Sequence, residues 1–170
     1  EFEQNIPDDE NRYLKLEGYV FPDTYQFFID ENPESVARKF LAAFNKRVTS
    51  DYYDRMEEVG LTLDETLTLA SIVQKEASNP EKMADVAEVF FNRLASSTYP
   101  RLESDVTVNY VENDIKPYLE KSNQAMYDAY NTYACEGLPV GPICNPGLDA
   151  INAVLYPSSH DYYFFISDEE

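Results

Sequence analysis

The hydrophobic residues of this chain recur every three or four positions over long stretches, which is the spacing of one helix face. Together with cap signals at their starts, these stretches predict four helices: Pro33 to about Met56, Leu63 to about Ala77, Pro80 to about Leu94, and about Leu148 to Tyr156. The second helix opens with a capping-box pattern formed by Thr62 and Glu65. The link between the second and third helices is short, which predicts that they pack as a hairpin.

Aromatic residues gather near both ends of the chain in patterns typical of strands. The segment 16–28 is interrupted by Gly18 and Pro22, which predicts two short strands joined by a turn. The segment 162–166 predicts another strand, and 105–110 either a strand or the start of a short helix. The predicted fold class is therefore α+β: one helix-rich domain with small strands near both chain ends.

One acid, Glu76, lies on the apolar side of the helix that is predicted to end near Ala77. Val73, Ile72 and Leu69 precede it by three, four and seven positions, so they share its face. Burial beside apolar side chains raises the pKa of a carboxyl, and a carboxyl that is protonated near neutral pH can donate a proton to a leaving group. Glu76 is a candidate general acid; the alternative is an acid that only caps the turn.

The composition of the chain limits the classes of ligand that it can bind. A length of 170 residues predicts one domain, or one domain with a small appendage. The chain carries 32 acids and 13 bases, a net charge of −19, which argues against binding to nucleic acid and against docking on an anionic membrane. No apolar run approaches membrane-spanning length. A single His without a ligand cluster argues against a metal site. The acidic, Tyr-rich composition suits a neutral polar ligand such as a sugar.

The two cysteines, Cys135 and Cys144, flank a turn rich in Gly and Pro. A disulfide that closes this turn and a pair of buried free thiols both remain open.

Several motifs follow one another along the chain: Leu16–Tyr25, Leu69–Ala77, Val89–Leu94, Leu102–Tyr110, Tyr130–Tyr133 and Gly137–Gly147. In this order they resemble the MltG/YceG-like family of endolytic murein transglycosylases. The resemblance covers residues 16–170 and implies one catalytic domain there, preceded by a polar segment, 1–15. The chain departs from the family pattern at its C-terminal end, because it stops at Asp168–Glu170, where sequences of the family usually continue.

The resemblance implies a lytic transglycosylase that cleaves the MurNAc–GlcNAc bond within peptidoglycan glycan strands and leaves 1,6-anhydroMurNAc ends. It implies Glu76 as the catalytic acid, no metal and no cofactor. Family members are usually held in the cytoplasmic membrane by an N-terminal helix and act outside it. On this basis the expected partners are glycan strands and cell-wall synthases, with the membrane reached only through an anchor that precedes this chain.

Six further residues are candidates for substrate binding: Gln74, Asn92, Arg93, Asp105, Asn131 and Thr132. Each has a structural alternative, such as polarity of a helix surface for Asn92 and Arg93, or a turn or capping acid for Asp105. Two other functions stay open. A hydrolytic muramidase would need a second carboxylate such as Asp105, and a glycan-binding or scaffolding domain would need no acid.

Overall fold

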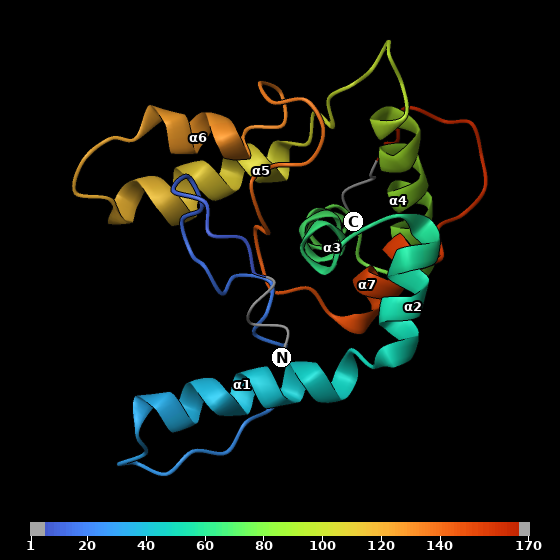
Figure 1. The fold of residues 1–170 in the computed structure, drawn as a ribbon. Coiled ribbons are helices and arrows are strands. Elements are labelled where there is room, and N and C mark those ends of the chain that lie inside the picture. The colour runs from blue at the N-terminus through green and yellow to red at the C-terminus, as the bar shows by residue number, and fades with distance from the viewer. Residues whose placement is uncertain (1–5, 167–170) are drawn as a thin grey trace.

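The computed structural model describes residues 6–166, and within them the protein is built of helices joined by long irregular segments (Figure 1). The elements in chain order are α1 (Pro33–Arg47), α2 (Ser50–Val59), α3 (Leu63–Glu76), α4 (Pro80–Leu94), α5 (Asp105–Tyr110), a π-helical turn (Val111–Ile115), a 3₁₀ turn (Lys116–Tyr118), α6 (Gln124–Tyr130) and α7 (Leu148–Leu155). Residues 1–5 of the predicted polar segment and the chain end at 167–170 lie outside the described residues.

Helix α3 is the centre of the core. Every residue from Thr66 to Val73 is buried, because α4 and α7 pack on α3 and on each other. The predicted capping box is confirmed: the Thr62 hydroxyl accepts from the Glu65 backbone N–H, and the Glu65 carboxylate accepts from the Thr62 N–H. The predicted bounds of α3, α4 and α7 are confirmed within one residue. Helices α3 and α4 pack on each other, as the short link between them predicts. They cross rather than run side by side, since Figure 1 looks down α3 while α4 lies across the view.

The single helix predicted from Pro33 to about Met56 is two helices. Helix α1 ends at Arg47, and Val48 and Thr49 have extended backbones before α2 begins. The Val48 side chain is only 1% exposed. Its burial fixes the chain at this point, and α2 then turns to pack against α3 and α7. The periodicity continues through the break, which is why the sequence pattern does not reveal it.

The predicted α+β fold class is wrong. Within residues 6–166 there is no sheet; an isolated bridge joins Arg101 and Gly137. The segments 16–28 and 162–166, predicted as strands, have irregular backbones. A strand needs a neighbouring strand to pair its backbone groups, and here side chains take that place. Segment 105–110, left open between strand and helix, is helix α5.

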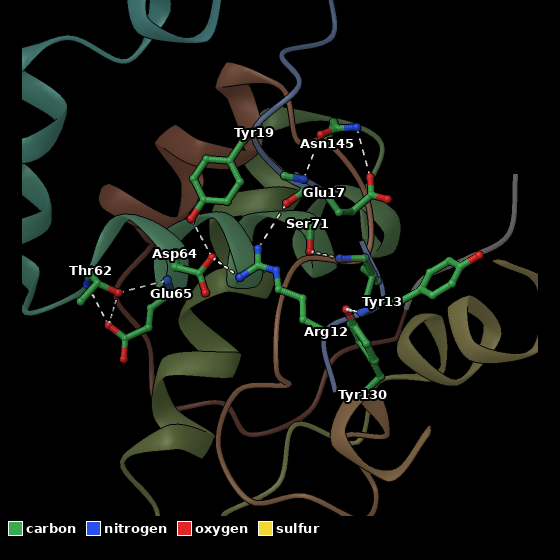
Figure 2. A network of polar contacts seen from close by, with 12 residues as sticks. Arg12, Tyr13, Glu17, Tyr19, Thr62, Asp64, Glu65, Ser71, Tyr130 and Asn145 are labelled. Carbon is green, nitrogen blue, oxygen red and sulfur yellow. Dashed lines mark hydrogen bonds and ion pairs between the residues drawn. The ribbon is translucent and has the colours of Figure 1, made fainter. Parts of the chain in front are cut away.

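Side chains hold the irregular N-terminal segment against the helices (Figure 2). The buried Arg12 guanidinium forms a 2.7 Å ion pair with Asp64 at the start of α3, and the Tyr19 hydroxyl donates to the same carboxylate. The Asn145 side-chain oxygen accepts from the backbone N–H groups of Gly18 and Val20. These contacts replace the strand pairing that the aromatic pattern predicts.

The loop 137–147 lies between this segment and α3. The Ser71 hydroxyl of α3 accepts from the Ile143 backbone N–H. Gly18 has a φ of +89°, and a Cβ there would lie 2.5 Å from Pro142 Cγ, so the close approach requires glycine. Cys135 and Cys144 are free thiols, which settles the alternative left open by their spacing.

Candidate active site

Glu76 is the last residue of α3, and its carboxyl is half-buried. The three apolar residues that share its face, Leu69, Ile72 and Val73, are fully buried. The core therefore holds the helix rigidly up to the acid, while the chain turns away at Ala77, whose backbone N–H still bonds to Val73.

A hydroxyl from a distant segment holds the Glu76 carboxyl. Ser104 Oγ donates to Glu76 Oε1 over 2.5 Å. Burial raises the pKa of Glu76, the hydrogen bond from Ser104 opposes that rise, and the charge of Asp105 adds to it. The raised pKa predicted from the apolar helix face is confirmed in direction. A carboxyl in this state retains its proton closer to neutral pH than an exposed glutamate does.

Ser104 is fixed by a buried cluster of hydroxyls. The backbone N–H of Ser104 donates to Thr132 Oγ1, and the backbone oxygen of Ser104 accepts from Thr107 Oγ1 over 2.8 Å. Thr107 and Thr132 are fully buried, and their hydroxyls hydrogen-bond each other. The preceding residue, Glu103, has a φ of +52°, an uncommon conformation for a residue other than glycine.

Two hollows adjoin at Glu76. The first has a volume of about 260 Å³ and extends from Glu76 toward the start of α5 and the segment that follows α6, with Asp105 and Tyr133 in its lining. The second, of about 220 Å³, extends toward the first turns of α4, where Lys82 and Asp85 line it. Glu76 and Phe165 line both, so the acid lies between two halves of one open cleft.

Asp105 lies in the same hollow as Glu76. It is the first residue of α5 and exposed, and its carboxylate accepts a 2.7 Å hydrogen bond from the Tyr133 hydroxyl. This bond and burial raise the pKa of Tyr133 to about 12, so Tyr133 remains a hydrogen-bond donor at neutral pH. The structure therefore brings a second carboxylate to the cleft.

Asn92 and Arg93 of α4 hold the C-terminal segment that borders the cleft. The Asn92 amide donates to the backbone oxygens of His160 and Tyr162, and Arg93 donates to that of Tyr163. Arg93 is buried, lines the first hollow and forms an ion pair with Glu103. Their polar groups are thus engaged within the protein.

The other three candidates lie outside the linings of both hollows. Gln74 accepts from the backbone N–H of Gly147, where α7 begins. Asn131 ends α6, and its side chain accepts from the Tyr133 N–H. Thr132 is buried and reaches Glu76 only through Ser104. The sequence reasoning missed Ser104, although its place beside Asp105 in a matched motif was a signal for it.

Among residues 6–166, no group of three or more His, Cys, Asp or Glu side chains is placed to hold a metal ion. Nor does that part of the chain contain a helix long and apolar enough to cross a membrane.

The fold that carries this acid is also found in a known protein structure, and the sequence matches a known family. The chain matches the YceG-like family over residues 2–170 and belongs to that family. A crystal structure of a YceG-like protein from Listeria monocytogenes superposes with a TM-score of 0.79 at 32% sequence identity, over 94% of this chain and 52% of that chain.

Two curated relatives carry the name endolytic murein transglycosylase. The protein from Streptococcus pneumoniae serotype 2 (strain D39) is 34% identical over 168 residues, which are 96% of this chain and 30% of that protein. The protein from Bacillus subtilis (strain 168) is 32% identical over 173 residues, 98% of this chain and 47% of that protein. The chain thus spans less than half the length of either relative.

Proposed function

We propose that this domain is a lytic transglycosylase that cleaves the MurNAc–GlcNAc bond within peptidoglycan glycan strands, with Glu76 as its single acid and base. The observation that carries the proposal is the position of Glu76: half-buried, with a raised pKa, and between two hollows of one cleft. The family membership and the names of the two relatives support it.

The chemistry needs one proton carrier. The protonated Glu76 donates to the glycosidic oxygen as the bond from that oxygen to C1 breaks. The C6 hydroxyl of the same MurNAc then attacks C1, and the Glu76 carboxylate takes the proton of that hydroxyl. The product is a 1,6-anhydro ring, no water is consumed, and Glu76 is protonated again. Ser104 holds the carboxyl in place through this exchange of roles.

The open cleft supports cutting inside a strand. Because a hollow lies on each side of Glu76, sugars can occupy positions on both sides of the bond that is cut. Polar groups that can bind sugar hydroxyls line both hollows: those of Asp105 and Tyr133 in the first, and those of Lys82 and Asp85 in the second. We assign the remaining candidates, Gln74, Asn92, Arg93, Asn131 and Thr132, to support of these walls.

A hydrolytic muramidase is the second candidate, and Asp105 is the observation that favours it. Its carboxylate lines the same hollow as Glu76, and its charge contributes to the raised pKa of Glu76. A carboxylate so placed could activate a water molecule against C1. In the first candidate Asp105 only tunes Glu76 and binds substrate. Because the substrate is the cell wall, either activity places the domain outside the cytoplasmic membrane.

Mass spectrometry of digested peptidoglycan tests the proposal, with Glu76→Gln as the matched variant. We expect products that are one water lighter than hydrolysed muropeptides, and no products from Glu76→Gln. Reducing-end products instead would establish the hydrolase. Intact peptidoglycan with both proteins, combined with retained glycan binding, would assign the domain to a binding or scaffolding role.

A further inference from the structure

Three aromatic rings form a continuous surface at the rim of the first hollow. Tyr99 lies 5.4 Å from Tyr163 and 5.3 Å from Phe164, measured between ring centroids. Their exposed fractions are 38%, 37% and 64%, respectively. Single exposed aromatic residues are ordinary, but a contiguous exposed group beside a cleft marks a binding surface. Tyr163 and Phe164 also line the hollow that contains Glu76.

Buried groups hold these rings in place. The Arg93 guanidinium lies 5.8 Å from the ring centroid of Tyr99 and 5.3 Å from that of Phe164, within cation–π range. Arg93 also donates to the Tyr163 backbone oxygen over 3.1 Å, and Asn92 donates to the Tyr162 backbone oxygen over 3.0 Å. The rings are thus ordered before a ligand arrives, which lowers the entropic cost of binding.

The surroundings of the rings select the chemistry of the ligand. The exposed carboxylate of Asp105 lines the same hollow and disfavours a negative charge on the part of the ligand that lies there. The charge of Arg93, the cation in that lining, is compensated by its ion pair with Glu103. The exposed ring of Phe164 is a flat apolar face that lies beside the hydrogen-bonding groups of the hollow. A pyranose ring has the matching chemistry, with one face of C–H bonds and hydroxyls at its edge.

We propose that Tyr99, Tyr163 and Phe164 form a stacking platform for one sugar ring of the glycan strand, next to the ring that reacts at Glu76. The inference rests on the proposed function for the identity of the strand. It gives Asn92 and Arg93 a role as positioning residues, which hold the platform and do not contact the sugar themselves.

Binding of peptide-free peptidoglycan glycan strands to the Glu76→Gln protein tests the platform without any need for catalysis. In that background, Phe164→Ala should weaken binding by about 3- to 10-fold, the scale of one aromatic contact, and Phe164→Tyr should restore it. Tyr156→Ala is the matched control. Tyr156 is 59% exposed and covers Arg55 at 4.8 Å, as Phe164 covers Arg93, but it lines neither hollow. We expect this control to bind as tightly as its parent.

Equal affinity of Phe164→Ala and its parent overturns the platform and leaves the proposed function standing. Absence of any glycan binding by the Glu76→Gln protein overturns it as well. Unchanged glycan affinity with loss of self-association in ultracentrifugation would assign the rings to a protein contact, again against the proposal. A further outcome separates the two proposals. If glycan binding depends on Phe164 but the wild-type domain cleaves no peptidoglycan, the platform is supported and the transglycosylase activity is refuted.

Discussion

At the scale of single residues, burial is the main cause of the raised pKa of Glu76, and two neighbours adjust that pKa in opposite directions. The Ser104 hydroxyl stabilises the charged carboxylate and lowers its pKa, whereas the charge of Asp105 destabilises it and raises its pKa. Since a general acid must be protonated, activity falls as pH rises through the pKa of Glu76. The alkaline limb of the pH profile therefore reports on both neighbours.

We expect Ser104→Ala to move the alkaline limb of kcat/KM to higher pH and Asp105→Asn to move it to lower pH. Ser104→Ala should also lower kcat by roughly 10- to 100-fold, because the acid loses its fixed orientation. Ser35→Ala is a control, since Ser35 donates to a surface carboxylate, that of Glu31, in the same way. Measured pH–rate profiles that move in one direction for both variants would contradict this account.

The same experiment separates the two candidate reactions. If Asp105 only tunes Glu76, Asp105→Asn retains activity with a shifted profile and still yields anhydro products. If Asp105 activates water, Asp105→Asn removes activity at every pH.

At the scale of elements, α3 carries the acid at one end and its strongest cap at the other. Thr62 and Glu65 satisfy backbone N–H groups of the first turn, and Glu76 is the last residue. The buried middle of the helix links the two ends. Loss of the cap should therefore reduce stability without altering the chemistry.

Thr62→Ala should lower the free energy of unfolding by about 0.5–2 kcal/mol, the usual cost of an N-cap hydroxyl. In a domain of this size, each kcal/mol lowers Tm by roughly 2–4 °C. Thr62→Ser keeps the hydroxyl, so it should lower the free energy of unfolding by only a fraction of the loss expected for Thr62→Ala. We expect all three proteins to have the same kcat at 25 °C; a lower kcat in Thr62→Ala alone would show that the cap affects the site.

At the scale of the whole molecule, the irregular N-terminal segment depends on one buried ion pair. The side chain of Arg12 is 2% exposed and that of Asp64 is 14% exposed. The Tyr19 hydroxyl also donates to Asp64, and Asn145 joins the same segment to the loop 137–147. Removing one ionic partner leaves the other charge buried without compensation.

Arg12→Met should lower the free energy of unfolding by about 3–5 kcal/mol. Asp64→Asn alone should also lower the free energy of unfolding. The double variant should lose less stability than the two single variants lose together, because neither partner is then left charged. Urea unfolding measures all three. Strictly additive losses would show that the two side chains do not stabilise each other.

Periodicity and caps are local, so the sequence predicts α3, α4 and α7 well. Thr62 with Glu65, and Asn79 with Pro80, mark helix starts through contacts within one turn. The same local pattern gave a wrong prediction at Val48, where long-range burial ends α1. It was also wrong for the aromatic segments 16–28 and 162–166, because no strand lies beside them within residues 6–166. Arg12 sits in a polar stretch, and nothing within that stretch indicates its partner Asp64.

For the site, the sequence alone determined the candidate acid, because the apolar residues that share the face of Glu76 lie in its own helix. Only the tertiary structure decided what surrounds it. Ser104 follows Glu76 by 28 positions, and the platform residue Phe164 lies still farther along the chain. Contacts over such separations depend on how the helices pack, and helical periodicity describes only which face of each helix is buried.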